Sequence, residues 1–325
     1  MQHVGRVRLV GGALAAALLA GSALAFAPVP ADGPKEEKIV FTTVSGEGKT
    51  VGIAIMNPDG SKRTALTKGD AMEMDPALSP DGKRIAFVTV GKEDHKSEIW
   101  VMKADGTDRK QLGENTGKGV VFSPCWSPDG RKIAYSQMAL GGGGPPTDAD
   151  LMVMDADGKN AKLLAKGLIP AWSPDGKKIL YSVIEKGGEF EPRLWVMDAD
   201  GKNAKELVKG RALMGAWSPD GKKVAYTGAD EGRRAQPHVY VCSADGSDPK
   251  QLTKGAEEGE LAPRWSADGK RVYFSRLPFK GPREKSSIFA VDADGTNEKE
   301  LGKSDGMDLL GGAPLFLLTR GEAKP

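Results

Sequence analysis

Cysteine and histidine are scarce in this sequence. Its 325 residues include 2 Cys and 3 His, and loss of an N-terminal leader would leave His95 and His238 as the remaining histidines. Metal centres usually draw several ligands from these two residue types, so we predict no cofactor, no metal site and no catalytic residues. Cys125 and Cys242 fall in different repeats and within hydrophobic stretches, which favours buried thiols over a disulfide.

A surplus of either charge is also absent. The chain has 46 Lys and Arg against 44 Asp and Glu, and loss of Arg6 and Arg8 with the leader would make the two counts equal. Nucleic-acid-binding proteins present a basic surface to the phosphates. We therefore predict no nucleic-acid partner.

A long apolar run occurs at the N-terminus, from Leu9 to Leu24. Arg6 and Arg8 precede it, and Ala23-Leu24-Ala25 ends it with small residues around a cleavage site, which is the layout of a signal peptide. We predict cleavage, no membrane span in the mature chain, and a periplasmic or secreted protein. The alternative is an uncleaved anchor, for which the run is short.

Two phrases recur along the rest of the chain. The first is Trp-Ser-Pro-Asp-Gly or a close variant, and its copies begin at Leu78, Trp126, Trp172, Trp217 and Trp265, spaced 48, 46, 45 and 48 residues apart. The second phrase resembles Asp-Ala-Asp-Gly, with its Gly at positions 60, 106, 158, 201, 246 and 295. Together they define six repeat units.

Both phrases predict tight turns. In Ser-Pro-Asp-Gly, Pro fixes φ at the second position and Gly takes the left-handed conformation at the fourth, which suits a type I turn between antiparallel strands. Asp and Gly tolerate positive φ in the second phrase. Short runs rich in Val, Ile, Trp and Tyr separate the turns and predict strands, so each unit is a sheet of four short strands.

Six such sheets must pack around a common axis to bury both of their faces. The sequence therefore predicts an all-β fold, a six-bladed β-propeller of four-stranded antiparallel blades. The recurring Trp residues are expected to fill the gaps between blades. The alternative for these rings is a ladder that stacks on a ligand.

The chain ends predict how the ring closes. The first unit starts at Lys38 with its second strand, and the last outer strand ends near Leu301, so we expect 312–319 to join the N-terminal blade and remove the open sheet edge. The predicted organisation is a signal peptide at 1–25, a short linker at 26–37, the propeller at 38–319 and a tail at 320–325.

The phrases Trp-Ser-Pro-Asp-Gly-Lys-Lys-Ile-Ala-Tyr and Leu-Trp-Val-Met-Asp-Ala-Asp-Gly resemble the propeller repeat of the TolB family, which is also found in prolyl-oligopeptidase-type enzymes. The resemblance covers residues 38 to about 319. It implies the propeller strongly, and a role at a cell-envelope complex loosely, because the same repeat serves several functions. TolB resembles a two-domain protein with an α/β domain ahead of its propeller, and this chain has about twelve residues between the predicted cleavage site and the first strand.

Residues that break the repeat are the candidates for binding, because residues present in every blade serve the fold. Arg264 stands in the inner-strand position held elsewhere by Ala77, Cys125, Ala171 and Ala216. We predict that it points into the channel and contacts a ligand. The alternative is a solvated charge paired with a neighbouring acid.

Further candidates lie on the face formed by the variable connections between second and third strands, where binding is expected on a repeated scaffold. They form a basic edge of Arg233, Arg234 and His238 and an acidic edge of Glu257, Glu258 and Glu260.

The sequence predicts a monomeric, non-catalytic scaffold that binds a protein or peptide through this face. One alternative is a lyase or hydrolase with carboxylates in the channel, and another is a gating module for a separate peptidase subunit. The paired turn residues Asp155/Asp157, Asp198/Asp200 and Asp292/Asp294 are interpreted as turn formers rather than calcium ligands, because they lack the spacing of an EF-hand loop.

Overall fold

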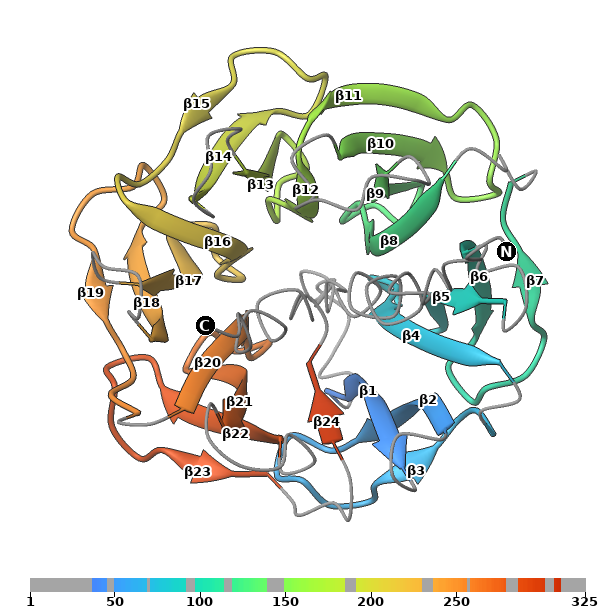
Figure 1. Ribbon diagram of the computed structural model, residues 1–325, viewed down its shortest axis with the longest axis horizontal. Helices are drawn as coiled ribbons and strands as arrows, with labels where there is room; N and C mark the ends of the chain where they lie inside the picture. Colours follow the sequence, from blue (N-terminus) through green and yellow to red (C-terminus); the bar gives the residue numbers. More distant parts are fainter. Residues whose placement is uncertain are drawn as a thin grey trace, which may run out of the picture.

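Six four-stranded sheets surround a central axis in the computed structural model (Figure 1). The structure describes residues 37–45, 50–68, 71–91, 97–113, 119–138, 149–184, 191–229, 236–255, 258–278, 286–301 and 307–310. Neighbouring strands within each sheet are antiparallel. The predicted six-bladed propeller is confirmed.

Each blade runs from an inner strand beside the axis to a short outer strand. Blade 1 has β24 (Met307–Leu309), β1 (Ile39–Ser45), β2 (Thr50–Met56) and β3 (Thr64–Ala65). Blade 2 has β4 (Met72–Leu78), β5 (Arg84–Val90), β6 (Ser97–Lys103) and β7 (Lys110–Gln111). Blade 3 has β8 (Val120–Trp126), β9 (Lys132–Met138), β10 (Asp150–Asp155) and β11 (Lys162–Lys166).

The other half of the ring has the same plan. Blade 4 has β12 (Leu168–Trp172), β13 (Lys178–Ile184), β14 (Pro192–Asp198) and β15 (Lys205–Glu206). Blade 5 has β16 (Arg211–Trp217), β17 (Lys223–Ala229), β18 (Pro237–Ser243) and β19 (Lys250–Gln251). Blade 6 has β20 (Glu258–Trp265), β21 (Arg271–Pro278), β22 (Ser287–Asp292) and β23 (Lys299–Glu300).

The ring closes in blade 1, where the C-terminal strand β24 pairs with β1. This confirms closure by the two ends of the chain, but the strand lies at Met307–Leu309 and not at the expected 312–319, a segment outside the described residues. The physical reason is visible in β24: Leu309 is buried, and Asp308 binds Arg63 of the same blade. The segment 312–319 is longer and more apolar, so it was the stronger strand prediction from the sequence. The ion pair between Arg63 and Asp308 instead stabilises the shorter strand Met307–Leu309.

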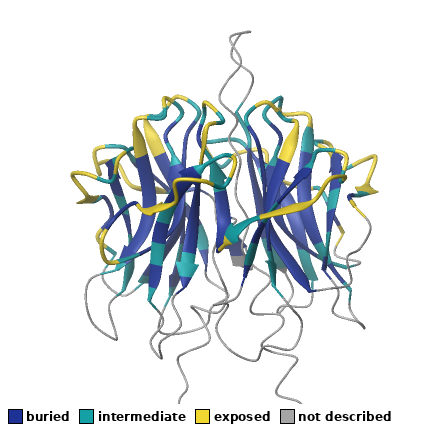
Figure 2. Ribbon diagram, turned by 90° about the horizontal axis from the view of Figure 1, so that it is seen from above, coloured by how far each residue is buried: buried dark blue, intermediate teal, exposed yellow. Residues whose placement is uncertain are grey.

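The turn predictions are confirmed by the backbone. Glycines of the Ser-Pro-Asp-Gly turns, such as Gly82 and Gly130, have φ of 69°. In the first such turn, Asp81 accepts hydrogen bonds from the Ser79 hydroxyl at 2.6 Å and the Lys83 N–H at 3.0 Å. All these turns lie at one end of the ring, which we call the turn face (Figure 2). The variable connections leave from the opposite end, the loop face.

Five inner strands, β4, β8, β12, β16 and β20, contain an irregularity that links the blade to the previous one. A residue with positive φ interrupts the register, for example Ile169 at φ 57° and Ala262 at φ 55°. Its N–H donates to a hydroxyl of the preceding blade, as Ile169 does to Ser136 at 2.9 Å and Ala262 to Thr227 at 3.2 Å. The equivalent donors in other blades bind Thr42, Ser182 and Ser275.

Blade 2 departs from this pattern because the position of the accepting hydroxyl is held by Val88, which has none. The carboxylate of Asp75, 1% exposed, instead accepts a hydrogen bond from the Ser123 N–H of blade 3 at 2.9 Å. A buried carboxylate beside the axis is therefore explained by an inter-blade contact.

Tryptophans at the ends of the inner strands pack between blades, as the sequence predicted. Trp126 of blade 3 belongs to an apolar cluster with Ala77 and Ala86 of blade 2, and its indole N–H donates to the Ala77 carbonyl at 3.1 Å. Trp265 packs in the same way on Ala216 and Ala225 of blade 5. Such burial of large rings holds the wedge-shaped blades together.

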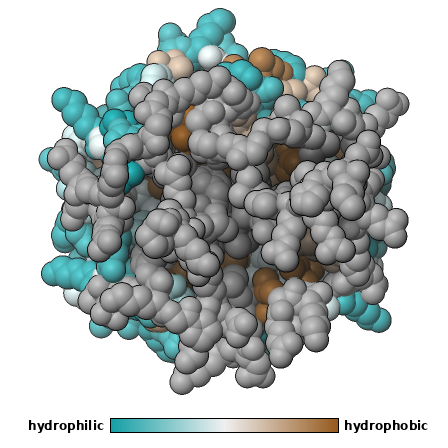
Figure 3. Space-filling view, viewed as in Figure 1, coloured by the Kyte–Doolittle hydropathy of each residue, from teal (hydrophilic) through white to brown (hydrophobic). Residues whose placement is uncertain are grey.

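Among the described residues, no helix is long and apolar enough to cross a membrane. Hydrophilic side chains of the described residues surround the outer rim of the ring (Figure 3). Among the described residues, one large hydrophobic side chain is exposed, that of Leu163, at 55%.

Candidate functional site

Arg264 lies on β20, the inner strand of blade 6. Register confirms that it occupies the position of Ala77 and Cys125, since all three are the next paired residues after the inner-strand irregularity. It interacts electrostatically with Cys125, although the two residues belong to blades 6 and 3, on opposite sides of the axis. The charge of Arg264 is therefore close enough to act on the Cys125 thiol.

Arg264 is 3% exposed, and its Nη1 donates to the Pro263 carbonyl at 2.7 Å. Removal of water from a guanidinium disfavours its charged form, which lowers the pKa of Arg264 to about 10. The alternative of a solvated charge is wrong, because the side chain is buried. Contact with a ligand stays a prediction.

Both cysteines are free thiols in the core, as expected. Burial raises the pKa of Cys125 to about 11 and that of Cys242 to about 12. Because the thiolate is the nucleophile, neither group has the chemistry of a nucleophilic cysteine.

A polar cluster at the loop face joins blades 5 and 6 around Glu260, which is fully buried. Its carboxylate contacts the ring Nδ1 of His238 at 2.9 Å and accepts a hydrogen bond from the Thr253 hydroxyl. Directly across the strand pair, Arg276 donates to Glu260 through Nε at 3.2 Å and through Nη2 at 2.5 Å. His238 comes from β18, Glu260 from β20 and Arg276 from β21, so the cluster connects three strands.

Arg276 contacts three carboxylates, more than its single positive charge can neutralise. Its guanidinium also contacts Glu258 at 3.3 Å and Glu298 at 2.8 Å, and it lies 4.1 Å from the ring centre of Phe289. Burial opposes the charged form, and hydrogen bonds from Arg276 to Glu298 and Glu260 outweigh it, so the pKa of Arg276 is raised. We call Glu258, Glu260, Glu298, Arg276 and His238 the Glu260 cluster. Its three carboxylates outnumber its one guanidinium, so it carries an excess of negative charge.

The same position is acidic in three consecutive blades. Glu73 in blade 2 and Asp308 in blade 1 match Glu260 by register, and they bind Arg109 and Arg63 respectively. Each of the three guanidiniums lies over an equivalent phenylalanine ring, which belongs to Phe41, Phe87 or Phe274. These ion pairs between an acid and an arginine thus stabilise the fold in all three blades. The Glu260 cluster differs from the other two in having additional carboxylates and a histidine.

The structure brings together three of the predicted candidates, His238, Glu258 and Glu260, with Arg276 between the two acids. Arg233, Arg234 and Glu257 lie outside the described residues. Sequence reasoning missed the roles of Arg276 and Glu298. Alignment of the second strands could have found Arg276, because its position holds Thr43, Thr89, Gln137, Val183 or Gly228 in the other blades.

Within the described ranges, no group of three or more His, Cys, Asp or Glu side chains is placed to hold a metal ion. The paired turn aspartates bind neighbouring donors instead. Asp155, for example, contacts Lys132 at 2.8 Å and Asn160 at 2.7 Å, and these hydrogen bonds lower its pKa.

Comparisons with solved structures agree with this fold. TolB from Acinetobacter baumannii matches with a TM-score of 0.69 and 20% identity over 85% of this chain and 66% of that one, so the chain spans just under two thirds of its length. A protein from Agrobacterium tumefaciens assigned as TolB matches with a TM-score of 0.63 and 21% identity, over 87% and 92%. Oligogalacturonate lyase from Vibrio parahaemolyticus matches with 0.56 and 12%, over 85% and 83%.

Comparison with curated protein sequences gives no match. The family model of the TolB beta propeller domain matches residues 32–308, which is most of the sequence. With the six blades and their repeated turns, this shows that the chain belongs to the TolB β-propeller domain family.

Proposed function

We propose that this protein is an exported, non-catalytic scaffold of the cell envelope that binds a protein or peptide through its loop face. The observation that carries the proposal is the Glu260 cluster. His238, Glu258, Arg276 and Glu298 break the repeat and gather with Glu260 where the variable connections of blades 5 and 6 leave the sheets.

The chemistry of the cluster favours recognition of a cationic group. Three carboxylates share one guanidinium, and Glu258 keeps 44% of its side chain exposed beside the buried Glu260. A Lys or Arg of a partner would complete the charge balance. The resident Arg276 holds the acids in place, so their arrangement exists before the partner binds.

Affinity capture from a cell-envelope extract tests this function. Wild-type protein and a Glu258→Lys variant are compared with a chain in which 139–148 and 279–285 are replaced by short turns. Asp248→Lys, which reverses an exposed charge beyond the second turn of blade 5, is the matched control. We expect the wild type and the control to capture the same partner, the loop variant to lose it and Glu258→Lys to hold it more weakly. Unchanged capture by the loop variant would contradict the proposal.

The alternative of a lyase or hydrolase has a separate test, because the fold is shared with oligogalacturonate lyase. Metal analysis of the purified full chain would find a stoichiometric metal ion if that alternative were correct. We expect none.

A further inference from the structure

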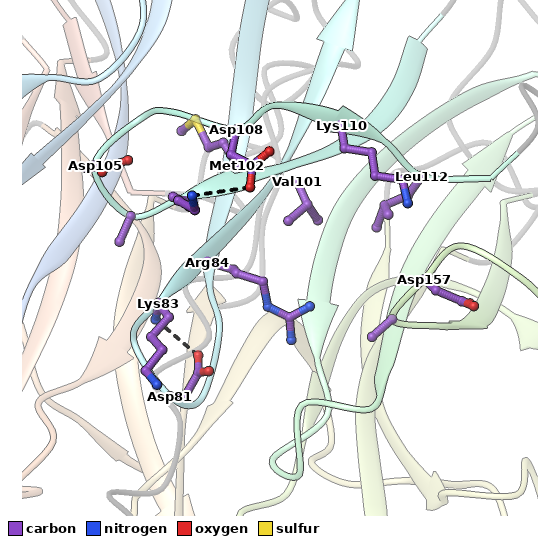
Figure 4. A pocket seen from close by; sticks show the side chains of 13 residues that line it. Asp81, Lys83, Arg84, Val101, Met102, Asp105, Asp108, Lys110, Leu112 and Asp157 are labelled. Atoms are coloured by element: carbon purple, nitrogen blue, oxygen red, sulfur yellow. Dashed lines mark hydrogen bonds and ion pairs between the residues drawn. The ribbon is translucent and has the colours of Figure 1, made fainter.

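Blade 1 lacks the turn that joins the inner and second strands of the other five blades. The copies of the Ser-Pro-Asp-Gly turn and its variant belong to blades 2 to 6, whereas β24 and β1 of blade 1 come from opposite ends of the chain. Figure 4 shows this turn in blade 2, where a dashed line joins Asp81 to Lys83. The turn of blade 6 therefore has no equivalent turn beside it in the following blade.

Contacts between neighbouring turns are regular in the rest of the ring. The proline of each turn in blades 2 to 5 lies beside the turn glycine of the following blade, so that a Cβ on this glycine would meet the proline ring within 4 Å. The pairs are Pro80 with Gly130, Pro128 with Gly176, Pro174 with Gly221, and Pro219 with Gly269.

Blade 6 has Ala267 where these blades have proline. The shape of the turn does not explain this change, because Gly269 has φ 68° and its equivalent in blade 5, Gly221, has φ 69°. Proline would therefore fit this turn as it fits the others, but it has no backbone N–H. The alanine gives the turn of blade 6 a donor that the turns of blades 2 to 5 lack.

A second departure from the repeat lies on β21. By register, Tyr273 holds the position of Ala225 in blade 5, which packs with Trp265 of the following blade. The sequence has no tryptophan in blade 1 to pack on Tyr273 in this way. Tyr273 is 1% exposed and belongs to the same apolar cluster as Ile39 of β1. An aromatic ring from blade 6 itself is thus buried near the start of β1.

Glu37 contacts both of these residues from the segment that enters β1. Its Oε1 accepts a hydrogen bond from the Ala267 N–H at 3.0 Å, and the Tyr273 hydroxyl interacts with the same carboxylate. Burial raises the pKa of Glu37 because it disfavours the charged form, and the hydrogen bond from Ala267 opposes this shift. Both departures from the repeat therefore meet a single side chain, beside the turn of blade 6.

We propose that Glu37, Ala267 and Tyr273 form a clasp that replaces the missing turn of blade 1 and closes the ring at the turn face. The strand β24 pairs with Thr42, Thr43 and Val44, in the half of β1 that approaches the loop face. The clasp holds the other end of β1, so the two ends of the chain close the ring at different heights. A leader joined to Glu37 would enter the ring on the side opposite the proposed binding surface, and the clasp does not depend on that function.

Hydrogen exchange of the Ala267 amide tests the clasp directly. Glu37→Ala should accelerate this exchange about tenfold because the N–H loses its acceptor, whereas Glu37→Gln keeps a side-chain oxygen and should leave the rate nearly unchanged. The amides of Ser266 and Gly269 are bonded within the turn and serve as internal controls. Asp59→Ala, which removes an acid from the second turn of blade 1, is the matched control variant. A wild-type rate for Ala267 in the Glu37→Ala protein overturns the proposal.

Ala267→Pro separates the clasp from the turn, because it restores the sequence of the other blades and removes the N–H. If the residue served the turn alone, proline would only stiffen it. With the clasp, the heteronuclear NOE of the Glu37 and Lys38 amides should fall, and addition of Glu37→Ala should lower it no further. Pro219→Ala makes the reverse change in blade 5 and should leave both amides unchanged. Wild-type NOE values in the Ala267→Pro protein would also overturn the proposal.

The contribution of Tyr273 has its own test. Tyr273→Phe keeps the buried ring and removes the hydroxyl, so it should accelerate exchange of the Ala267 amide about twofold or more. An unchanged rate would exclude the hydroxyl of Tyr273 from the clasp.

Discussion

At the scale of single residues, the balance between burial and charge explains the Glu260 cluster. A fully buried carboxylate has lost its hydration, which costs several kcal/mol unless other groups replace the lost water contacts. Glu260 receives such replacement from Arg276, Thr253 and His238. The ion pair with Arg276 is therefore needed for the stability of the fold, independently of any contribution to binding.

Arg276→Met should consequently destabilise the fold by about 3 kcal/mol, because it leaves Glu260 buried without its counter-charge. The free energy of unfolding, measured with urea, checks this value. Arg271→Met, which removes an exposed arginine from the same strand, is the control and should change stability little. Addition of Glu260→Gln to Arg276→Met should restore much of the loss, and equal stability of the single and double variants would contradict this account.

At the scale of elements, the repeated turns carry a pH dependence. Hydrogen bonds from the Ser173 hydroxyl and the Lys177 N–H lower the pKa of Asp175, and Ser218 and Lys222 do the same for Asp220. A folded pKa below the unfolded value of about 3.9 means that the stabilisation is complete above that value and is lost as the pH falls through the folded pKa.

Stability should therefore decline on acidification below about pH 4, and the Asp175→Asn/Asp220→Asn variant should show a shallower decline. Asparagine keeps a side-chain oxygen that accepts these hydrogen bonds, but it does not titrate. Urea unfolding at several pH values between about 2.5 and 6 measures the slope. The control Asp248→Asn removes an exposed carboxylate outside these turns, and a slope equal to its own would refute the role of the turn aspartates.

The elements also show what the sequence could predict. Short-range signals, such as Pro and Gly at fixed turn positions and the alternation of apolar residues, determine the blades, so these were predictable. The arginine that binds each buried acid was not predictable, because its place in the blade differs. Glu73 is bound by Arg109, which precedes an outer strand, whereas Glu260 is bound by Arg276 on β21. Such contacts depend on which side chains cross the blade face, and a single sequence contains no signal for that.

At the scale of the whole molecule, the two halves of the ring differ. Blades 6, 1 and 2, on either side of the closure, have an acid on the inner strand, an arginine bound to it and a phenylalanine beneath the arginine. The equivalent rings of blades 3, 4 and 5 are Tyr135, Tyr181 and Tyr226. The ion pairs are thus concentrated where the chain ends meet, and Glu37, which accepts a hydrogen bond from the Ala267 N–H of blade 6 at 3.0 Å, adds another contact there.

The closing strand β24 has three residues, so side-chain contacts must stabilise it. Arg63 binds Asp308 with one nitrogen at 2.7 Å from Oδ1 and also donates to Thr43 at 2.9 Å, which ties β24 to the outer part of blade 1.

Asp308→Ala should therefore favour local opening of the ring. Among Thr42, Thr43 and Val44 of β1, the amides whose N–H points to β24 should exchange hydrogen about tenfold faster, which corresponds to about 1.4 kcal/mol of lost local stability. Asp150→Ala, which removes an exposed ion pair with Lys166 in blade 3, should leave these amides unchanged. If both variants exchange alike, the closure does not depend on Asp308, and backbone pairing with the apolar contacts of Leu309 is sufficient to hold the two ends of the chain together.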